Sequence, residues 1–395
     1  GTRRAALAAK GVEFLDALVA AGTTSGACLA VSRHGGQPAV YATGHSGPTT
    51  SAAITGGLRG SMQLRSDSIF MTASVTKPFT AAAVMLLVQE VRLTLHDRVA
   101  DHLCEFAGED VQVHHLLSHT SGLPDSWAGN HPLRKRHAPL ADYFHEQLAA
   151  KLLFRPGTNV SYSSVAIDLA AAVVEKVSGQ TLSEFLHQRF FLPLAMTDTS
   201  LGHPPGAQWS RNKAREVCLN LRPGRHNRAG RTVGGPNELP LGSLSFGNSD
   251  YWRELGCPSG GLCTTVADLL RFMEAFLLCK THGTARQGFP LSAETVALMT
   301  RSHTGDAIAA AARAGVELLD GGSWGLGWRI NAEGSTRVFG TQSQGSQTFG
   351  AHGSSGCMAW ADPESGMVCV VLTPEPDLCY STEFNVLSDL LGSAR

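Results

Sequence analysis

The sequence predicts an α+β protein, in which one antiparallel sheet flanked by terminal helices is assembled from both ends of the chain, with a mostly helical part inserted between them. Three observations predict this arrangement. Short β-type runs lie near both ends, residues at the two termini show helical spacing, and patterns rich in alanine and leucine fill the middle. We expect residues 1–70 and 300–395 to form the sheet part and residues 71–299 to form the mostly helical part.

The individual elements follow from periodicity and turn residues. Apolar residues at helical intervals predict an opening helix over residues 4–20, and two β-type runs around His34–Gln37 predict a hairpin over 27–33 and 39–42. Near the other end, strands are expected at 324–330, 336–340, 357–361 and 367–372, before a helix at 379–391. The middle carries helical patterns at 74–90, 133–153, 165–177, 181–191 and 264–278.

The stretch from residue 202 to 261 is dense in proline, glycine, arginine and asparagine and has no period. A connection of this length in a compact domain is either functional or a surface excursion. It carries Trp209, Tyr251 and Trp252. We therefore expect it to be either a surface excursion or a lid beside the substrate, with Trp252 as a substrate-binding residue.

Composition limits the partners. The chain has 395 residues, with 32 Lys+Arg against 33 Asp+Glu, so it lacks the cationic excess that nucleic acids or anionic membranes require. Its longest interior apolar run, residues 79–88, is about half of the roughly 20 residues that a membrane span needs. Small molecules are therefore the expected partners. The sequence predicts no metal or nucleotide cofactor and does not indicate an oligomeric state.

Nine scattered cysteines without CxxC pairs predict free thiols and favour the cytoplasm. Because the sequence begins at Gly1 and not at a methionine, it is also compatible with the earlier removal of a signal peptide, so the sequence alone does not decide the compartment.

The strongest chemical signal is Ser74-Val-Thr-Lys77 at the start of an apolar helix. On a helix, positions i and i+3 share a face, so the Lys77 amine can reach the Ser74 hydroxyl. A serine is a weak nucleophile until a base takes its proton, and a desolvated lysine can be that base. The same pattern at Ser210–Lys213 lies in the polar stretch, where nothing holds its spacing, and a surface pair is expected there.

Several segments together resemble the family of serine β-lactamases and penicillin-binding-protein-like enzymes, in particular its class C branch with the family VIII esterases. They include SVTKPFTAAAVMLLV, HHLLSHTSGLPD, FRPGTNVSYSSVAIDL, PSGGLCTTVADLL and FGAHGSSGCMAWADP, in this order over about residues 25–395. The resemblance implies the β-lactamase/transpeptidase-like fold. It also implies that Ser74 is the acylated nucleophile and Lys77 its proton partner.

The resemblance extends to a Tyr-x-Asn motif, which implies that Tyr162 shuttles protons to and from the leaving group. The sequence departs from this motif at Ser164, where the family usually carries asparagine. The shorter hydroxyl of Ser164 is expected to hydrogen-bond to Lys77 or to substrate.

The third family motif, Lys/His-x-Gly, corresponds without gaps to Ala351-His352-Gly353, so alanine stands in the cationic position. Since successive strand residues face opposite sides, His352 would then point away from the site. A shift by one residue would instead put His352 in the cationic position and Ser354 in the glycine position. In the gapless alignment, which we prefer, the backbone N–H groups of Ser74 and Ser354 form the oxyanion hole.

Two competing motifs are weaker. Gly321–Gly325 fits the G-x-S-x-G elbow around Ser323, but a strand pattern follows it instead of the required helix. His115 and His119 have a metal-like spacing but lack the glutamate of a zinc protease and a third ligand.

The sequence therefore predicts a serine hydrolase that forms an acyl-enzyme on Ser74 and acts on a small-molecule ester or amide. The absence of a cation at Ala351 favours small neutral esters. Acyltransferase, D-amino-acid peptidase and β-lactamase activities remain alternatives within the fold, and a non-catalytic ligand-binding module is an alternative of another class.

Overall fold

The structure is a computed structural model that describes residues 2–46, 62–108, 110–126, 130–202, 215–217, 219, 248–283, 286–340, 344–376 and 378–393, with the side chains of residues 2–8 left aside. Within this part of the chain, seven strands form one sheet in the order β2-β1-β10-β9-β8-β7-β6, and every neighbouring pair is antiparallel. Its strands are β1 (Gly26–Arg33), β2 (Ala39–Gly44), β6 (Ser323–Trp324), β7 (Arg329–Ile330), β8 (Phe349–Gly353), β9 (Cys357–Asp362) and β10 (Met367–Leu372).

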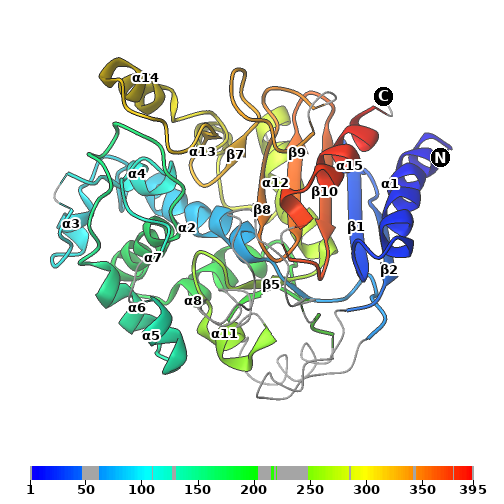
Figure 1. Cartoon of the computed structure of the whole chain (residues 1–395), viewed down its shortest axis with the longest axis horizontal. Coiled ribbons are helices and arrows are strands. Elements are labelled where there is room, and N and C mark those ends of the chain that lie inside the picture. Colours follow the sequence, from blue (N-terminus) through cyan, green and yellow to red (C-terminus); the bar gives the residue numbers. More distant parts are fainter. Residues whose placement is uncertain are drawn as a thin grey trace.

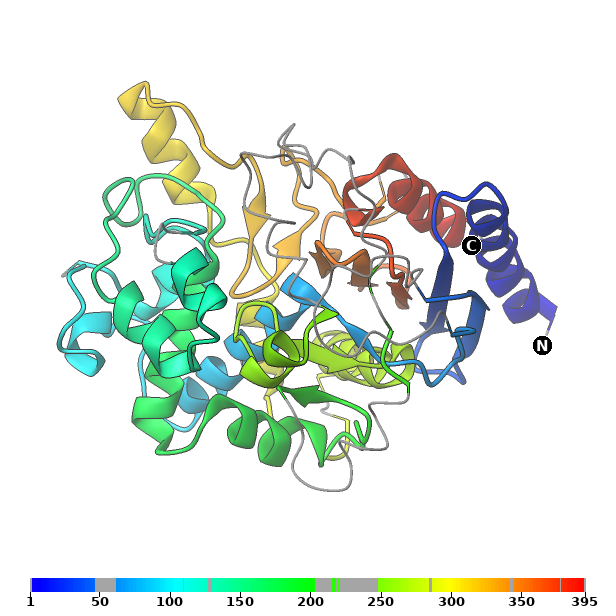
Figure 2. The same cartoon turned by 60° about the horizontal axis from the view of Figure 1, so that its bottom comes forward.

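Helices cover both faces of this sheet. Helices α1 (Thr2–Ala20) and α15 (Thr382–Gly392) lie side by side on one face, as Figures 1 and 2 show in blue and red. The apolar side chains between them and the sheet form one core cluster, which includes Leu387 and Trp360. On the other face, α12 (Val266–His282) packs against β1, β9 and β10 and belongs to a second, larger cluster.

The larger cluster continues into the helical part. Helix α2 (Lys77–Gln89) is buried from Lys77 to Leu87, because its sequence is apolar on every side, and it packs against α7 (Ser164–Ser178). The ring of Phe79 stacks on Phe272 of α12 with centroids 3.8 Å apart. The remaining helices are α3 (Val99–His102), α4 (Val113–Leu117), α5 (Asn130–Lys135), α6 (Leu140–Gln147), α8 (Leu182–Leu186), α11 (Asp250–Leu255), α13 (Ala293–Met299) and α14 (Gly305–Ala314).

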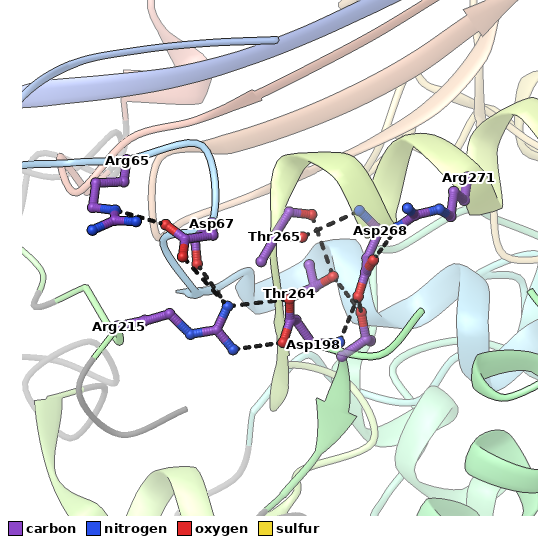
Figure 3. Close-up of polar contacts among 9 residues, drawn as sticks. Arg65, Asp67, Asp198, Arg215, Thr264, Thr265, Asp268 and Arg271 are labelled. Carbon is purple, nitrogen blue, oxygen red and sulfur yellow. Dashed lines mark hydrogen bonds and ion pairs between the residues drawn. The ribbon is translucent and has the colours of Figure 1, made fainter. Parts of the chain in front are cut away.

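A second sheet has three strands, β3 (Phe70–Met71), β5 (Leu262–Thr264) and β4 (Ser200–Leu201), in that order. Figure 3 shows the ionic network at its edge. Arg215 contacts Asp67 and Asp198, and the backbone N–H of Asp198 donates to the buried Asp268 carboxylate at 2.8 Å. Arg271 in turn pairs with Asp268. The network ties the segment that contains Arg215 to the base of the sheet.

The structure confirms the predicted α+β architecture, in which an antiparallel sheet from both chain ends lies between helices. It differs from the expected elements in detail. Residues 324–330 form two short strands joined by a turn, since Gly327 has a φ of 82°, and residues 336–340 are irregular. The helix expected over 133–153 is divided into α5 and α6, and Pro139 caps the second.

The proposed division of the chain at residues 70 and 299 stays a prediction. Helix α12 falls in the segment that we expected to be the helical part, although it packs on the large sheet.

Candidate active site

Ser74 lies in a short 3₁₀ turn, η1 (Ala73–Thr76), that leads directly into α2. The residue before it, Ala73, has a φ of 45°, a left-handed conformation that costs a non-glycine residue about 1–3 kcal/mol and often marks a functional site. The Nζ atom of Lys77 lies 3.1 Å from Ser74 Oγ. The spacing predicted for a helical turn therefore brings these two side chains together, even though the turn is 3₁₀.

Lys77 is buried, with 3% of its surface exposed, and donates a hydrogen bond to the carbonyl oxygen of Ser259 at 2.9 Å. Desolvation lowers the pKa of Lys77 below its ordinary value, while the charges of Asp125 and Asp168 oppose this effect. An amine in this environment gives up its proton more readily than a surface lysine. It is thus suited to accept a proton from Ser74.

Tyr162 is the third member of this group. Its hydroxyl donates to Ser74 Oγ at 2.6 Å, and its ring centroid lies 4.7 Å from Lys77 Nζ. Burial raises the pKa of Tyr162 well above its ordinary value, and the charge of Asp125 adds to this. The phenol is therefore a neutral donor, and Ser74 Oγ accepts hydrogen bonds from both Tyr162 and Lys77.

Local structure fixes the tyrosine. The next residue, Ser163, caps α7 by accepting a hydrogen bond from the backbone N–H of Ala166, and its own N–H donates to Nδ1 of His119 at 3.1 Å. The His119 ring lies 4.8 Å from that of Tyr162 and 4.4 Å from that of Trp324. Burial lowers the pKa of His119 to about 3, so its imidazole is neutral and serves as an acceptor.

The end of β8 passes directly against the backbone that carries Ser74. A Cβ atom on Gly353 would lie 2.0 Å from the carbonyl oxygen of Thr72 and 3.2 Å from the backbone nitrogen of Ser74. Only glycine allows this approach. It brings the chain at Ser354 close to Ser74, and the role of these two N–H groups as an oxyanion hole stays a prediction.

Ala351 and His352 lie on opposite faces of β8. Ala351 belongs to the cluster shared with α2 and α12, whereas the His352 ring lies 4.9 Å from Tyr380 and 6.4 Å from Phe339, toward the terminal helices. The alternation of side chains along a strand explains this difference. This orientation is the one expected from the gapless alignment, whereas the alignment shifted by one residue would have placed His352 at the substrate. A substrate-binding role of Ala351, His352 and Gly353 stays a prediction.

Ser164 was expected to hydrogen-bond to Lys77 or to substrate; it does not bond to Lys77, and a contact with substrate stays a prediction. Its hydroxyl donates to Oδ1 of Asp125 at 2.7 Å, and its backbone N–H donates to the same oxygen at 2.9 Å. Asp125 was missed in the sequence analysis, although it directly follows the HTSGLP segment. It brings a negative charge to the site, and this charge raises the pKa values of both Lys77 and Tyr162.

Trp252 lies in helix α11, with 7% of its surface exposed, in a small cluster with Ile69, Met71 and Cys263. The guanidinium of Arg134 stacks on its ring at 4.6 Å. None of the contacts of the described residues joins it to Ser74, Lys77 or Tyr162. Trp252 therefore anchors α11 as a core residue, and most of the expected lid, including Trp209, falls outside the described residues.

The competing motifs occupy other settings. Ser323 lies in β6, where its hydroxyl donates to Ser302 Oγ at 2.7 Å, and a strand follows it. His115 Nδ1 accepts from the backbone N–H of Gln112 at 3.0 Å. Ser210 lies outside the described residues.

Among the residues described, no group of three His, Cys, Asp or Glu side chains is placed to hold a metal ion, and no helix could span a bilayer.

Comparisons with known proteins bear on the family and the fold of the chain. A family model described as Beta-lactamase matches residues 13–377. Protein Rv1367c of Mycobacterium tuberculosis is 29% identical over 342 residues, which is 80% of this chain and 80% of that protein.

Two solved structures share the fold over almost their whole length. EstCE1, a hydrolase with promiscuous acyltransferase activity, has a TM-score of 0.71 and 20% identity, covering 100% of this chain and 99% of its own. A family VIII carboxylesterase has a TM-score of 0.70 and 20% identity, covering 96% of each chain.

Proposed function

Because the chain belongs to the β-lactamase family of serine hydrolases, we propose that it is an esterase that forms an acyl-enzyme on Ser74 and acts on small neutral esters. The observation that carries the proposal is the convergence of two groups on Ser74 Oγ, with the Tyr162 hydroxyl at 2.6 Å and the Lys77 amine at 3.1 Å. One group can accept the serine proton while the other donates one.

The reaction follows from these contacts. Ser74 Oγ attacks the ester carbonyl while its proton passes to the neutral Lys77 amine, and the backbone N–H groups of Ser74 and Ser354 stabilise the oxyanion. Tyr162 then donates its proton to the departing alcohol oxygen and is reprotonated from the Lys77 ammonium. In the second half, water gives up a proton to the same pair, attacks the acyl carbon, and Ser74 recovers its proton as the acid leaves.

The charges around the site support a neutral substrate. Alanine occupies position 351, where the family usually carries a cation that can bind a substrate carboxylate. The exposed Asp125 adds a negative charge close to Lys77 and Tyr162. A substrate carboxylate, such as that of a β-lactam or a peptide C-terminus, would meet repulsion from Asp125 with no cation at 351 to offset it.

One preparation can test the proposal against its alternatives. We expect a fluorophosphonate probe to label Ser74, as read by intact mass, and p-nitrophenyl acetate and butyrate to be hydrolysed faster than nitrocefin or a D-alanyl peptide. Ester consumption that yields mainly the transfer product when an alcohol is added would indicate an acyltransferase. Absence of both labelling and turnover would support the ligand-binding alternative.

A further inference from the structure

Asp168 is a buried carboxylate in an otherwise apolar stretch of α7, with 6% of its surface exposed. A carboxylate at such a position requires hydrogen-bond partners. The side-chain amide of Gln147 donates to its Oδ2 at 2.9 Å, and the backbone N–H of Ser259 donates to its Oδ1 at 3.1 Å. The thiol of Cys257 lies 3.8 Å from the same Oδ1.

The contact with Ser259 leads directly to the catalytic amine. Ser259 donates its N–H to Asp168, while its carbonyl oxygen accepts the hydrogen bond from Lys77 at 2.9 Å. The turn that contains Ser259 is also held from α2, since the hydroxyl of Thr80 donates to the carbonyl of Pro258 at 2.7 Å. Asp168 on α7 and Thr80 on α2 therefore hold the turn whose Ser259 carbonyl orients Lys77.

Asp168 also acts on Lys77 through its charge. The charged or titratable groups that influence the Lys77 amine include Asp125, Asp168 and Cys257, together with His119 and the phenol of Tyr162. Those near Asp168 are Lys77, Cys257 and the guanidinium of Arg134. Desolvation destabilises the ammonium form of Lys77, and it also raises the pKa of Asp168. The hydrogen bonds from Gln147 and Ser259 and the charge of Lys77 favour the carboxylate form of Asp168, whose negative charge offsets part of the loss at Lys77.

We propose that Asp168 is a positioning residue of the active site, which orients Lys77 through the Ser259 carbonyl and stabilises its ammonium form by charge. This role rests on the proposed serine-hydrolase mechanism, because Lys77 must alternate between amine and ammonium in each half-reaction. Asp168 does not touch substrate. Its influence reaches the reaction only through Lys77.

The test is Asp168→Asn, which removes the charge but keeps the size of the side chain and an oxygen that can accept from Ser259. The matched control is Glu175→Gln on the same helix, because Glu175 also accepts a backbone N–H bond, that of Leu182 at 2.9 Å. Both variants are compared with the wild type by thermal unfolding and by the pH profile of kcat/KM for p-nitrophenyl acetate.

We expect the acid limb of the Asp168→Asn profile to move to lower pH by on the order of one unit, because loss of the nearby negative charge makes the ammonium form of Lys77 less stable. The rate on the plateau should fall several-fold, because a less basic amine is a weaker general base. Glu175→Gln should change neither the limb nor the plateau. A profile that coincides with that of the wild type would overturn the proposal.

A measurement that does not depend on turnover separates this inference from the proposed function. The chain has seven lysines, so a ¹³Cε titration of labelled protein can follow Lys77, assigned by its loss in Lys77→Arg. A lower Lys77 pKa in Asp168→Asn, but not in Glu175→Gln, would support the charge effect even if no ester were cleaved. An unchanged Lys77 pKa would overturn it, whereas an unlabelled Ser74 would count against the esterase alone.

Discussion

Replacing Gly353 by alanine tests how closely β8 must approach Ser74. The added Cβ would lie 2.0 Å from the carbonyl oxygen of Thr72, and real Cβ contacts are essentially never shorter than 3.0 Å. The two backbones must therefore separate by about 1 Å, the difference between these distances. Rotation of a side chain cannot relieve the clash, because the position of Cβ is fixed by the backbone of residue 353 and its partner is a backbone carbonyl. The backbone of Thr72 is itself held, since its N–H donates to the carbonyl oxygen of Leu262 at 2.9 Å.

The expected loss of activity follows from this displacement. A shift of about 1 Å in a catalytic site costs roughly 100-fold in rate, and loss of one oxyanion donor costs roughly 100- to 1,000-fold in kcat. We therefore expect Gly353→Ala to lower kcat/KM for p-nitrophenyl acetate by at least about 100-fold, which corresponds to about 2.7 kcal/mol of transition-state stabilisation. The same variant should remain folded at the assay temperature.

The assay is ester hydrolysis normalised to the fraction of folded protein, with thermal unfolding followed by circular dichroism. Gly305→Ala in α14 is the matched control, because a Cβ there would meet no atom within 4 Å, and its kcat/KM should equal that of the wild type. A folded Gly353→Ala that retains activity within about threefold of the wild type would refute the reasoning. It would mean that the N–H of Ser354 does not contribute to the oxyanion hole.

Other substitutions test the remaining assignments. Ser74→Ala should abolish fluorophosphonate labelling, while Ser323→Ala and Ser210→Ala keep it; labelling of Ser74→Ala by intact mass would refute the nucleophile assignment. His119 stays neutral down to about pH 3 when folded but gains a proton near pH 6.5 when unfolded, so this residue lowers stability by up to about 1.4 kcal/mol per unit as the pH falls between these values. His119→Asn, which tolerates the φ of 59°, should show a smaller loss from pH 7 to 5 in urea titrations, and an equal loss would contradict this account. Trp252→Ala should lower the free energy of unfolding by about 3–5 kcal/mol, measured in urea, and a loss below about 1 kcal/mol would argue against its role in the core.

Local patterns in the sequence were sufficient to predict the main elements. The periodicity of residues 165–177 predicts α7 within one or two residues, and β9 and β10 follow the apolar runs at 357–361 and 367–372 closely. The i, i+3 spacing likewise predicted the contact between Ser74 and Lys77. These features depend on neighbours in sequence, which is why one sequence is enough to predict them.

Other features depend on residues that meet only in the folded chain. Nothing in the sequence near Ser164 indicates that its hydroxyl bonds to Asp125, 39 residues earlier. The Ser259 carbonyl oxygen, which accepts the hydrogen bond from Lys77, is a backbone group, so the residue type at position 259 does not predict this contact. Trp252, in turn, was expected at the substrate because aromatic residues at loop ends suit a lid, whereas α11 buries it in the core.

The positions of Ser74 and Lys77 depend on close approaches of two glycines and on one buried carboxylate. Gly353 meets Thr72 on the sheet side, and Gly327 lies so close to α2 that a Cβ there would be 2.3 Å from the Cβ of Ala81. Asp168 in turn holds the Ser259 turn by accepting a hydrogen bond from the backbone N–H of Ser259. Because these contacts hold the segment that carries Ser74 and Lys77, small substitutions at the glycines should reduce the rate more than the stability. Large substitutions elsewhere in the apolar core should do the reverse, since they leave the approach of β8 to Ser74 intact as long as the chain folds.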